Sequence, residues 1–258
     1  MKLKLRITKS IIPNLLTLGN LFSGFSAIIY ISKNEFEIAA GMLLVAGIFD
    51  LLDGIVARLI RATSEIGIQL DSLCDAVSFG VVPSYFLYTV YFHSLGEIGI
   101  VISSLPALGG VYRLARFNVH ATLEDKNYFT GMPIPAAAIY IMSFIVFHYL
   151  DPNLSENLKT IGIFIVVFSA PLLMISIIKF DNLPRPSWKS IKVHPWNFGI
   201  TIFGIIVIIA SLGKLLFPMM LFYIILNVLR ALFNIGKNTP GRRISGSKET
   251  SKLKNQKI

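Results

Sequence analysis

The chain has 258 residues, of which 54% are hydrophobic and 15% are charged, and its formal net charge is +10. Soluble globular domains contain about 25% charged residues, so this composition excludes an ordinary soluble domain and indicates a protein with many membrane spans. Its single cysteine, Cys74, excludes an intramolecular disulfide, and the basic residues lie mostly between apolar runs rather than in a patch that predicts binding to nucleic acid.

Apolar stretches of about 20 residues are long enough to cross a bilayer core of roughly 30 Å. Such stretches predict eight transmembrane helices, in chain order at 11–31, 36–60, 68–92, 97–115, 134–150, 159–178, 197–213 and 215–236. A bilayer excludes unpaired backbone, which favours helices throughout. We therefore expect an all-α integral membrane protein whose residues 1–236 form a single helical bundle.

The basic residues predict the orientation of this bundle, because lysine and arginine are enriched on the cytoplasmic side of membrane proteins. A cytoplasmic N-terminus places all 24 of them on that side except Lys33, Lys159 and Lys214. We therefore expect both termini in the cytoplasm and the bundle in the cell (cytoplasmic) membrane. The polar, basic segment 237–258 predicts a disordered cytoplasmic tail that anionic lipid headgroups attract.

Four aspartates lie in the second and third predicted spans. Asp50 and Asp53 are three residues apart, and Asp71 and Asp75 are four apart, so each pair lies on one face of its helix. At about 1.5 Å per residue, both pairs lie at a similar distance from the turn between the spans, in the cytoplasmic leaflet. Charged residues inside a span cost at least about 2.5–3.5 kcal/mol by insertion scales and usually mark function.

Converging carboxylates repel one another unless cations neutralise them. Hard divalent ions such as Mg²⁺ or Mn²⁺ prefer oxygen ligands and often bind together with substrate phosphates. The carboxylates alone are also compatible with an ion- or proton-coupled transporter. Transporters often contain repeated halves, whereas this chain has no internal repeat and gathers these acids in one quarter of its length.

The residues between the acids help to distinguish a metal-dependent site from a transporter. The stretch from Asp50 to Asp75 fills every fixed position of the pattern D-x2-D-G-x2-A-R-x8-G-x3-D-x3-D. It resembles the signature of the CDP-alcohol phosphatidyltransferases. The resemblance implies an enzyme in which the hydroxyl of an acceptor alcohol displaces CMP from a CDP-linked lipid, with the active site facing the cytoplasm.

The resemblance also implies a role for each matching position. Asp50, Asp53, Asp71 and Asp75 would hold two divalent ions, Mg²⁺ or Mn²⁺, and Asp75 would also act as general base. A short N-x-x-T element in the first span, Asn14 and Thr17, resembles one that lines the nucleotide site. The candidate residues for binding the CDP-lipid are Asn14, Thr17, Gly54, Ala57, Arg58, Ser64 and Gly67.

Other interpretations of these residues remain open from the sequence. Gly54 and Ala57 leave room for a nucleotide, but small residues are also typical of tight helix packing in membranes. Arg58 suits a phosphate, but it equally suits an interfacial anchor. Ser64 could contact the nucleotide or cap the third helix, and Asn14 could be a polar packing residue.

The acceptor is indicated by four further stretches, namely QLDSLCDAVSFGVVPS (69–84), YRLARFN (112–118), FTGMPIPAAA (129–138) and SAPLLMISIIKF (169–180). Within the family they resemble the membrane-embedded phosphatidylserine synthases, which implies CDP-diacylglycerol as donor, L-serine as acceptor and a homodimer. Glycerol 3-phosphate or inositol remains an alternative acceptor. The candidate acceptor-binding residues are Arg113, Arg116, Asn118, Ser78 and Phe79. Alternatively, the two arginines form a basic flank of the span, and Ser78 and Phe79 are helix-packing residues.

Overall fold

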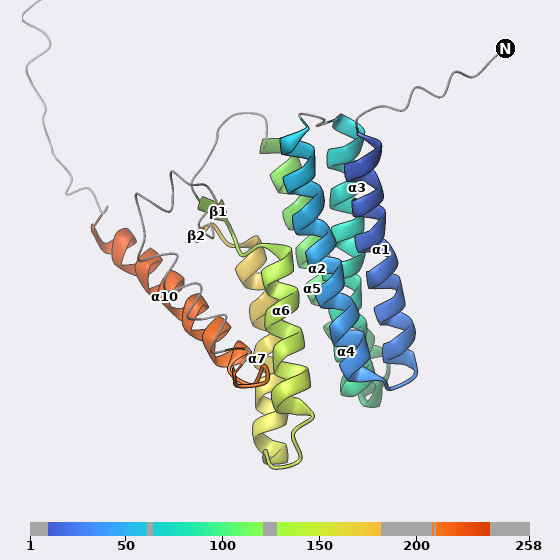
Figure 1. Ribbon diagram of the computed structural model, residues 1–258. Coiled ribbons are helices and arrows are strands. Elements are labelled where there is room, and N and C mark those ends of the chain that lie inside the picture. The colour runs from blue at the N-terminus through green and yellow to red at the C-terminus, as the bar shows by residue number, and fades with distance from the viewer. Residues whose placement is uncertain (1–9, 61–63, 121–127, 182–207, 209, 238–258) are drawn as a thin grey trace, which may run out of the picture.

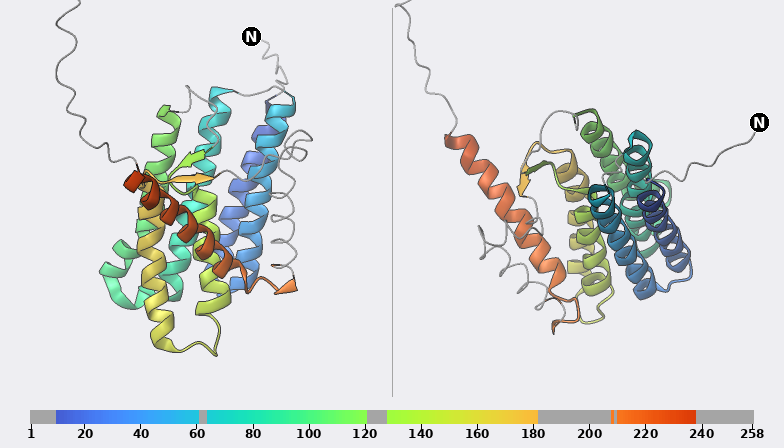
Figure 2. Two further views of the ribbon diagram at one scale, coloured as in Figure 1. Left: turned by 90° about the vertical axis from the view of Figure 1, so that its left-hand side faces the viewer. Right: turned by 45° about the horizontal axis from the view of Figure 1, so that its top comes forward.

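The structure is a computed structural model that describes residues 10–60, 64–120, 128–181, 208 and 210–237. Most of its helices run nearly parallel or antiparallel, and their ends gather at two opposite ends of a bundle (Figure 1). Two further views show that the C-terminal helix crosses this bundle at an angle (Figure 2). The predicted helical bundle is therefore confirmed, and the candidate site lies toward the upper end of the bundle in Figure 1.

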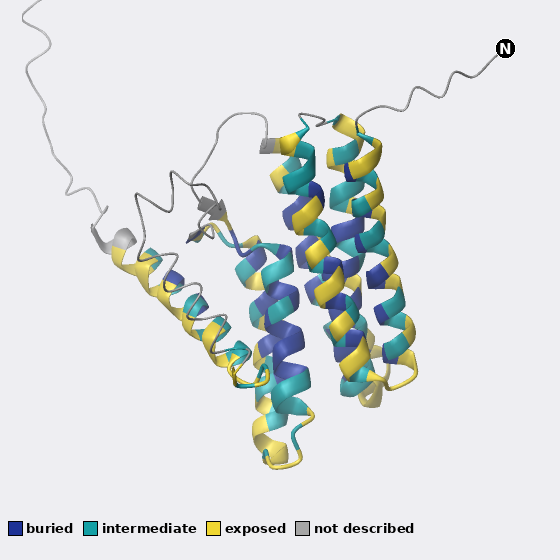
Figure 3. Cartoon of the chain, in the orientation of Figure 1, coloured by how far each residue is buried: buried dark blue, intermediate teal, exposed yellow. Residues whose placement is uncertain are grey.

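The first two predicted spans form an antiparallel hairpin of α1 (Ile11–Ser32) and α2 (Phe36–Leu59). The two helices pack along their length through small buried residues, among them Ala27 and Ala46, which let the helix backbones approach closely. Asn34 makes the turn between them with a φ of 62°. Their outward faces are apolar, as expected for helices in contact with lipid (Figure 3).

The third predicted span is one helical run with three segments, α3 (Glu65–Asp75), the π-helix η1 (Ala76–Val81) and α4 (Val82–Val90). Ser64 begins the run, since its Oγ accepts a hydrogen bond of 3.0 Å from the Gly67 amide. The wider π-helical turns start directly after Asp75. Such π-segments occur frequently at functional sites, and this one changes which side chains of the run face α1.

The fourth predicted span begins after the short 3₁₀ turn η2 (Phe92–Leu95), where Gly96 has a φ of 59°. From there α5 (Gly96–His120) is longer than predicted, because the helix continues past residue 115. Arg116 and Asn118 therefore lie on a helix rather than in a loop. The extension brings these polar residues beside α3 and α7.

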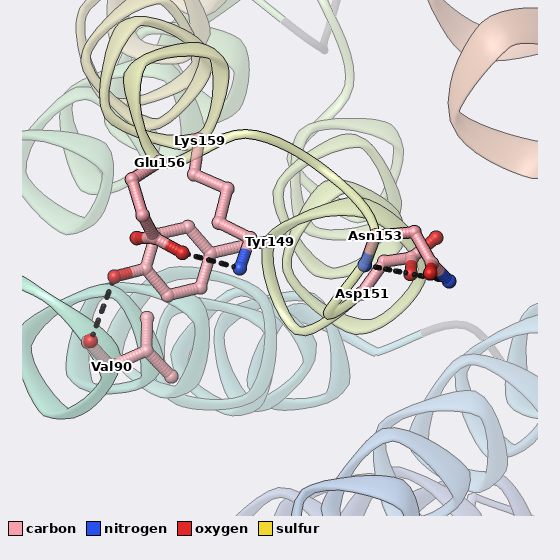
Figure 4. Close-up of polar contacts among 6 residues, drawn as sticks. All are labelled: Val90, Tyr149, Asp151, Asn153, Glu156 and Lys159. Atoms are coloured by element: carbon pink, nitrogen blue, oxygen red, sulfur yellow. Dashed lines mark hydrogen bonds and ion pairs between the residues drawn. The ribbon is translucent and has the colours of Figure 1, made fainter.

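The next two spans form a second hairpin, made by α6 (Ile134–Phe144), its π-helical extension η3 (Ile145–Tyr149) and α7 (Glu156–Ile175). Polar contacts fix the turn between them (Figure 4). The Tyr149 hydroxyl donates to the Val90 carbonyl oxygen at 3.2 Å, and the Asn153 amide donates to Asp151 Oδ1 at 2.9 Å. The hairpin is thereby attached to the end of α4.

A small antiparallel strand pair departs from the all-α expectation. Strand β1 (Tyr128–Thr130) pairs with β2 (Lys179–Asp181), with Phe129 opposite Phe180. Both strands lie beyond the helix ends, where backbone groups no longer need helical hydrogen bonds. The pair connects the segment before α6 to the segment after α7.

The C-terminal helix α10 (Leu216–Lys237) follows a turn in which Leu212 and Gly213 have positive φ angles of 51° and 84°. Its first turn packs Phe217 against the rings of Tyr140 and Phe144. Much of its remaining surface is exposed, as Figure 3 shows, and many of these exposed residues are large and apolar. The turn at Gly213 lies at the boundary between the predicted spans 197–213 and 215–236.

The described part of the chain contains six helices that are long and apolar enough to cross a membrane, and a shorter apolar helix covers residues Ile134–Tyr149. These correspond to seven of the eight predicted spans. The predicted span at 197–213 and the predicted tail at 237–258 lie almost entirely outside the described residues. The structure thus supports a polytopic membrane protein and leaves the seventh span, at 197–213, a prediction.

Candidate active site

Three of the four aspartates form a compact cluster between α2 and α3. One carboxylate oxygen from each of Asp50, Asp53 and Asp71 lies within 4.8 Å of the others. The helical spacing of the acids and the packing of both helices on α1 bring these three together. The sequence predicted that all four acids converge. Asp75 lies one turn further along α3, and only 7% of its surface is exposed.

The cluster suits a hard divalent cation. Asp71 Oδ1 is buried and has no hydrogen-bond partner among the described residues, so an oxygen that requires a partner points into the cluster region. The Thr17 hydroxyl lies 2.6 Å from Asp53 Oδ2 and 3.0 Å from the Pro13 carbonyl oxygen, which orients Asp53 from α1. Carboxylate oxygens are the ligands that Mg²⁺ and Mn²⁺ prefer.

A cavity of about 500 Å³ adjoins these acids. Asp53 and Asp71 form part of its wall, so the acids and the cavity belong to one site. Its volume falls in the range of pockets that bind small molecules and cofactors. The wall also includes every candidate for binding the CDP-lipid, namely Asn14, Thr17, Gly54, Ala57, Arg58, Ser64 and Gly67.

The two glycines of this wall have different surroundings. A Cβ atom added at Gly54 would have only Arg58 Nη2 nearby, at 4.0 Å, so this glycine borders open space rather than a tightly packed helix. A Cβ atom added at Gly67 would lie 3.1 Å from Ser64 Oγ and 3.3 Å from Asn14 Oδ1. Gly67 therefore allows α1 and α3 to approach each other. Ser64 both caps α3 and lines the cavity, so its two sequence interpretations are compatible.

Sequence reasoning missed the apolar part of the wall, which consists of Pro13, Ile68 and Phe117. The ring of Phe117, a residue that is 49% exposed, also lies beneath the Arg113 guanidinium, whose carbon is 5.9 Å from the ring centroid. The chain contains 19 phenylalanines, and no chemical feature of position 117 separates it from the others. Its place next to Arg116 and Asn118 was the only available signal.

The predicted acceptor-binding residue Arg116 has an extensive structural role. Its Nη1 donates to the carbonyl oxygen of Ile175 at 2.6 Å. Its Nη2 lies within 3.1–3.3 Å of three further carbonyl oxygens, those of Thr130, Met174 and Ser176. The guanidinium thus satisfies carbonyl groups at the C-terminal end of α7, which a helix leaves without internal partners.

The other acceptor candidates lie close to the acids but outside the cavity wall. Asn118 Nδ2 donates to Ser72 Oγ at 2.9 Å, and Ser78 Oγ donates to the Asn20 carbonyl oxygen at 3.1 Å. Phe79 belongs to the buried core, and the Arg113 side chain is buried above Phe117. The structure brings these residues near Asp75 by packing, and their contact with an acceptor stays a prediction.

Comparisons with known proteins agree on one family. A family model described as CDP-alcohol phosphatidyltransferase matches residues 10–180, which include the four aspartates and the whole cavity wall. A Helicobacter pylori protein named CDP-diacylglycerol–serine O-phosphatidyltransferase is 32% identical over 228 residues, which cover 86% of this chain and 91% of that protein.

Two further relatives show the same pattern. The CDP-diacylglycerol–serine O-phosphatidyltransferase of Bacillus subtilis is 31% identical over 186 residues, covering 72% of this chain and 98% of that protein. The archaetidylserine synthase of Methanothermobacter thermautotrophicus is 38% identical over 177 residues, covering 67% of this chain and 70% of that protein. The similarity therefore extends over most of the helical bundle.

Proposed function

The chain belongs to the CDP-alcohol phosphatidyltransferase family, and from this premise we propose that it transfers the phosphatidyl group of CDP-diacylglycerol to the hydroxyl of L-serine. The products are phosphatidylserine and CMP. The main support for the proposal is that the acid cluster adjoins a cavity of about 500 Å³. Serine enters the proposal through the names of the relatives, which act on serine according to those names.

The cavity wall suggests how the donor binds. Arg58 lies at the exposed end of α2 and offers a planar cation to the pyrophosphate. Asn14 and Ser64 provide an amide and a hydroxyl for the polar groups of the nucleotide, and the open space beside Gly54 accepts its bulk. The acyl chains then extend along the apolar outer faces of the bundle into the lipid.

Asp50, Asp53 and Asp71 would hold a divalent ion, Mg²⁺ or Mn²⁺, and Asp75 would join them in holding a second. When bound, such ions neutralise the pyrophosphate and stabilise the charge that develops on the attacking and leaving oxygens. Thr17 supports this set by fixing the orientation of Asp53. The carboxylate oxygens support this assignment, as does Asp71 Oδ1, which has no hydrogen-bond partner within the described ranges.

Asp75 acts as general base in this proposal. A serine hydroxyl is a poor nucleophile at neutral pH, and a positioned base activates it. Asp75 takes the hydroxyl proton, the serine oxygen forms a bond to the lipid-side phosphorus, and the bond from that phosphorus to the CMP oxygen breaks. The burial of Asp75 and its contact with Asp50 support this role, because the base then lies next to the acids that would hold the ions.

The positive-inside pattern supports a cytoplasmic active site in the cell membrane. The described helix ends at the site carry Arg58 and the nearby Arg113 and Arg116, whereas Lys33 and Lys159 lie at the opposite end. Cytosolic serine would then reach the site directly, and CMP would leave into the cytosol. The family resemblance further suggests that the enzyme works as a homodimer.

The experiment that tests the proposal is CMP release by the purified protein in detergent, with CDP-diacylglycerol and Mg²⁺ or Mn²⁺. Parallel reactions contain L-serine, glycerol 3-phosphate, inositol or no acceptor. Release that requires both serine and metal supports the proposed function. Release with another acceptor overturns serine as the substrate and keeps the chemistry, and the absence of release with every acceptor from folded protein overturns the function.

A further inference from the structure

Asn20 is a polar residue of α1 that neither the signature nor the N-x-x-T element includes. It is fully buried, with 0% of its surface exposed, and its Nδ2 donates a hydrogen bond of 3.0 Å to Asp75 Oδ1. Asn20 follows Thr17 by three residues, so the two side chains project from neighbouring sides of α1. Helix α1 therefore contacts one carboxylate of α2 through Thr17 and one of α3 through Asn20.

A second contact fixes Asn20 against the same helical run. Its backbone carbonyl accepts a hydrogen bond of 3.1 Å from Ser78 Oγ, in the first π-helical turn after Asp75. One turn along α1, a Cβ atom added at Gly24 would lie 2.2 Å from Ser78 Oγ and 2.9 Å from Ser78 Cα. The two backbones are thus in direct contact here, and the position of Asn20 relative to Asp75 is tightly determined.

The remaining polar atom of the side chain, Asn20 Oδ1, is buried and has no hydrogen-bond partner among the described residues. A buried amide oxygen without a partner destabilises a folded protein, and an apolar side chain of similar size would pack there without this cost. Stability therefore does not explain the amide. The contact with Asp75 explains the presence of the amide. An amide donates a hydrogen bond to a carboxylate oxygen but does not itself take up a proton.

We infer that Asn20 is a positioning residue that fixes the orientation of the Asp75 carboxyl group. The inference rests on the proposed function in so far as Asp75 is the base of that reaction. By holding Oδ1, the amide restricts rotation of the carboxyl group and determines where its other oxygen points. The Asp75 side chain also lies within hydrogen-bond distance of Asp50, so the amide orients a carboxyl group that adjoins the acid cluster.

The test compares Asn20→Leu, which keeps the size and removes the donor, with the full-length parent protein. A matched control is Asn227→Leu, because Asn227 is also buried and its Nδ2 donates to a carbonyl oxygen, that of Tyr223, in α10. Partners that orient a metal-site residue typically contribute 10–100-fold to activity or affinity. We expect kcat to fall about 10–100-fold in Asn20→Leu only, with the KM for CDP-diacylglycerol changed by less than about threefold.

Two measurements separate positioning from a structural role. Thermal unfolding in detergent should give Asn20→Leu a midpoint equal to or above that of the parent. Binding of Mn²⁺ alone, followed by the loss of the free-ion electron paramagnetic resonance signal, is compared in an Asp75→Asn background, where Asn20→Leu should not change the affinity of the Asp50, Asp53 and Asp71 cluster. A kcat close to the parent value overturns the inference, as does a loss of kcat that accompanies a lower midpoint in both Asn20→Leu and Asn20→Ala, or weaker Mn²⁺ binding in that background.

An infrared measurement distinguishes failure of this inference from failure of the proposed function. The carboxyl band of Asp75 is identified in metal-free protein by its loss in Asp75→Asn. It should shift in Asn20→Leu and stay in place in Asn227→Leu, whatever acceptor the enzyme uses. An unshifted band overturns the role of Asn20 alone, whereas a parent protein that releases no CMP overturns the proposed function alone.

Discussion

At the scale of single residues, the hydrogen bonds from α1 give the four aspartates different surroundings. Asp53 accepts a hydrogen bond from the Thr17 hydroxyl, and Asp75 accepts one from the Asn20 amide. Asp71 has a buried oxygen without a hydrogen-bond partner in the described part of the chain. Four residues of one type can therefore perform different tasks. The following two predictions separate the task of Asp75 from that of Asp53.

Asp75→Asn should abolish turnover and leave CDP-diacylglycerol binding within about threefold of the parent value. The amide keeps the shape of the side chain but cannot accept the hydroxyl proton, and loss of a positioned base typically costs 10²–10⁴-fold in rate. Single-turnover CMP release and equilibrium binding of the CDP-lipid measure the two quantities. Retained activity would remove Asp75 from the role of base.

Thr17→Val should weaken Mn²⁺ binding by about 10–100-fold, because it removes the hydroxyl that orients Asp53 while preserving the shape of the side chain. Titration of the free-ion resonance signal measures the change. Thr89→Val is the matched control, since the Thr89 hydroxyl donates to the Tyr85 carbonyl oxygen within α4. Equal Mn²⁺ affinity in Thr17→Val and the parent would show that Thr17 does not support the metal ligands.

At the scale of helices and strands, two close contacts hold the site together. Arg116, near the end of α5, donates hydrogen bonds to four carbonyl oxygens. Three of them lie at the end of α7, and one lies in the segment before α6. Gly24 brings α1 against the π-helix that follows Asp75. Each contact can be removed by one substitution, and the predicted results differ.

Arg116→Leu should destabilise the protein by about 1.5–3 kcal/mol, the usual contribution of hydrogen bonds to a charged group. Thermal unfolding in detergent measures the loss. Lys159→Leu serves as the control, because Lys159 forms a pair with the exposed Glu156 and such pairs contribute about 0–1 kcal/mol. If Arg116→Leu instead raises the KM for serine at unchanged stability, Arg116 binds the acceptor and its structural role is secondary.

Gly24→Ala should destabilise the protein by about 1–3 kcal/mol, since the new methyl group would overlap Ser78. It should also reduce turnover, because the overlap moves α1 away from Asp75. Gly41→Ala in α2 is the control, with nothing within 4 Å of the added methyl group, and alanine favours a helix more than glycine. A stable, fully active Gly24→Ala variant would show that α1 and η1 adjust without cost.

The elements also show what the sequence could predict. Hydrophobic run length predicted the described membrane helices to within a few residues. The spacing from Asp50 to Asp75 and the N-x-x-T element pointed to residues that form three quarters of the acid set and the polar wall of the cavity. The role of Arg116 could not be predicted, because its partners are backbone carbonyls 14 and 58–60 residues away that have no side-chain signal. The hydrophobic periodicity of the sequence likewise could not predict the π-helix after Asp75.

Asn20 illustrates the same limit within the site. A single buried asparagine in an apolar helix predicts polar packing of unspecified kind, and only the position of α1 against α3 identifies Asp75 as its partner. Phe117 was missed because an apolar residue in an apolar chain has no distinguishing chemistry. Patterns of charge thus located the site, and packing determined its remaining members.

At the scale of the whole molecule, the bundle has two chemically different ends. The end with the site carries Arg58 and Arg116, and the other end carries Lys33 and the turn of Figure 4, where Lys159 pairs with Glu156. This asymmetry predicts the orientation of the protein in the membrane. The native cysteine helps to test it, because Cys74 is only 1% exposed and should not react with large reagents.

Lys33→Cys should react with a membrane-impermeant maleimide in intact spheroplasts, and Glu65→Cys should react only after the membrane is permeabilised. Both positions are exposed in the structure and lie at opposite ends of the bundle. The parent protein, with Cys74 alone, provides the background. The reverse labelling pattern would place the site on the outer side and contradict the proposed orientation.

The contacts that α1 makes with Asp53 and Asp75 also have a consequence for biogenesis. Ribosomes synthesise α1 before α2 and α3, so the hydroxyl of Thr17 and the amide of Asn20 are already in the membrane when the acidic helices leave the translocon. Inserting a carboxyl group into lipid is costly, and a waiting donor reduces that cost. The order of the helices along the chain thus makes the first helix an intramolecular chaperone for the two that follow.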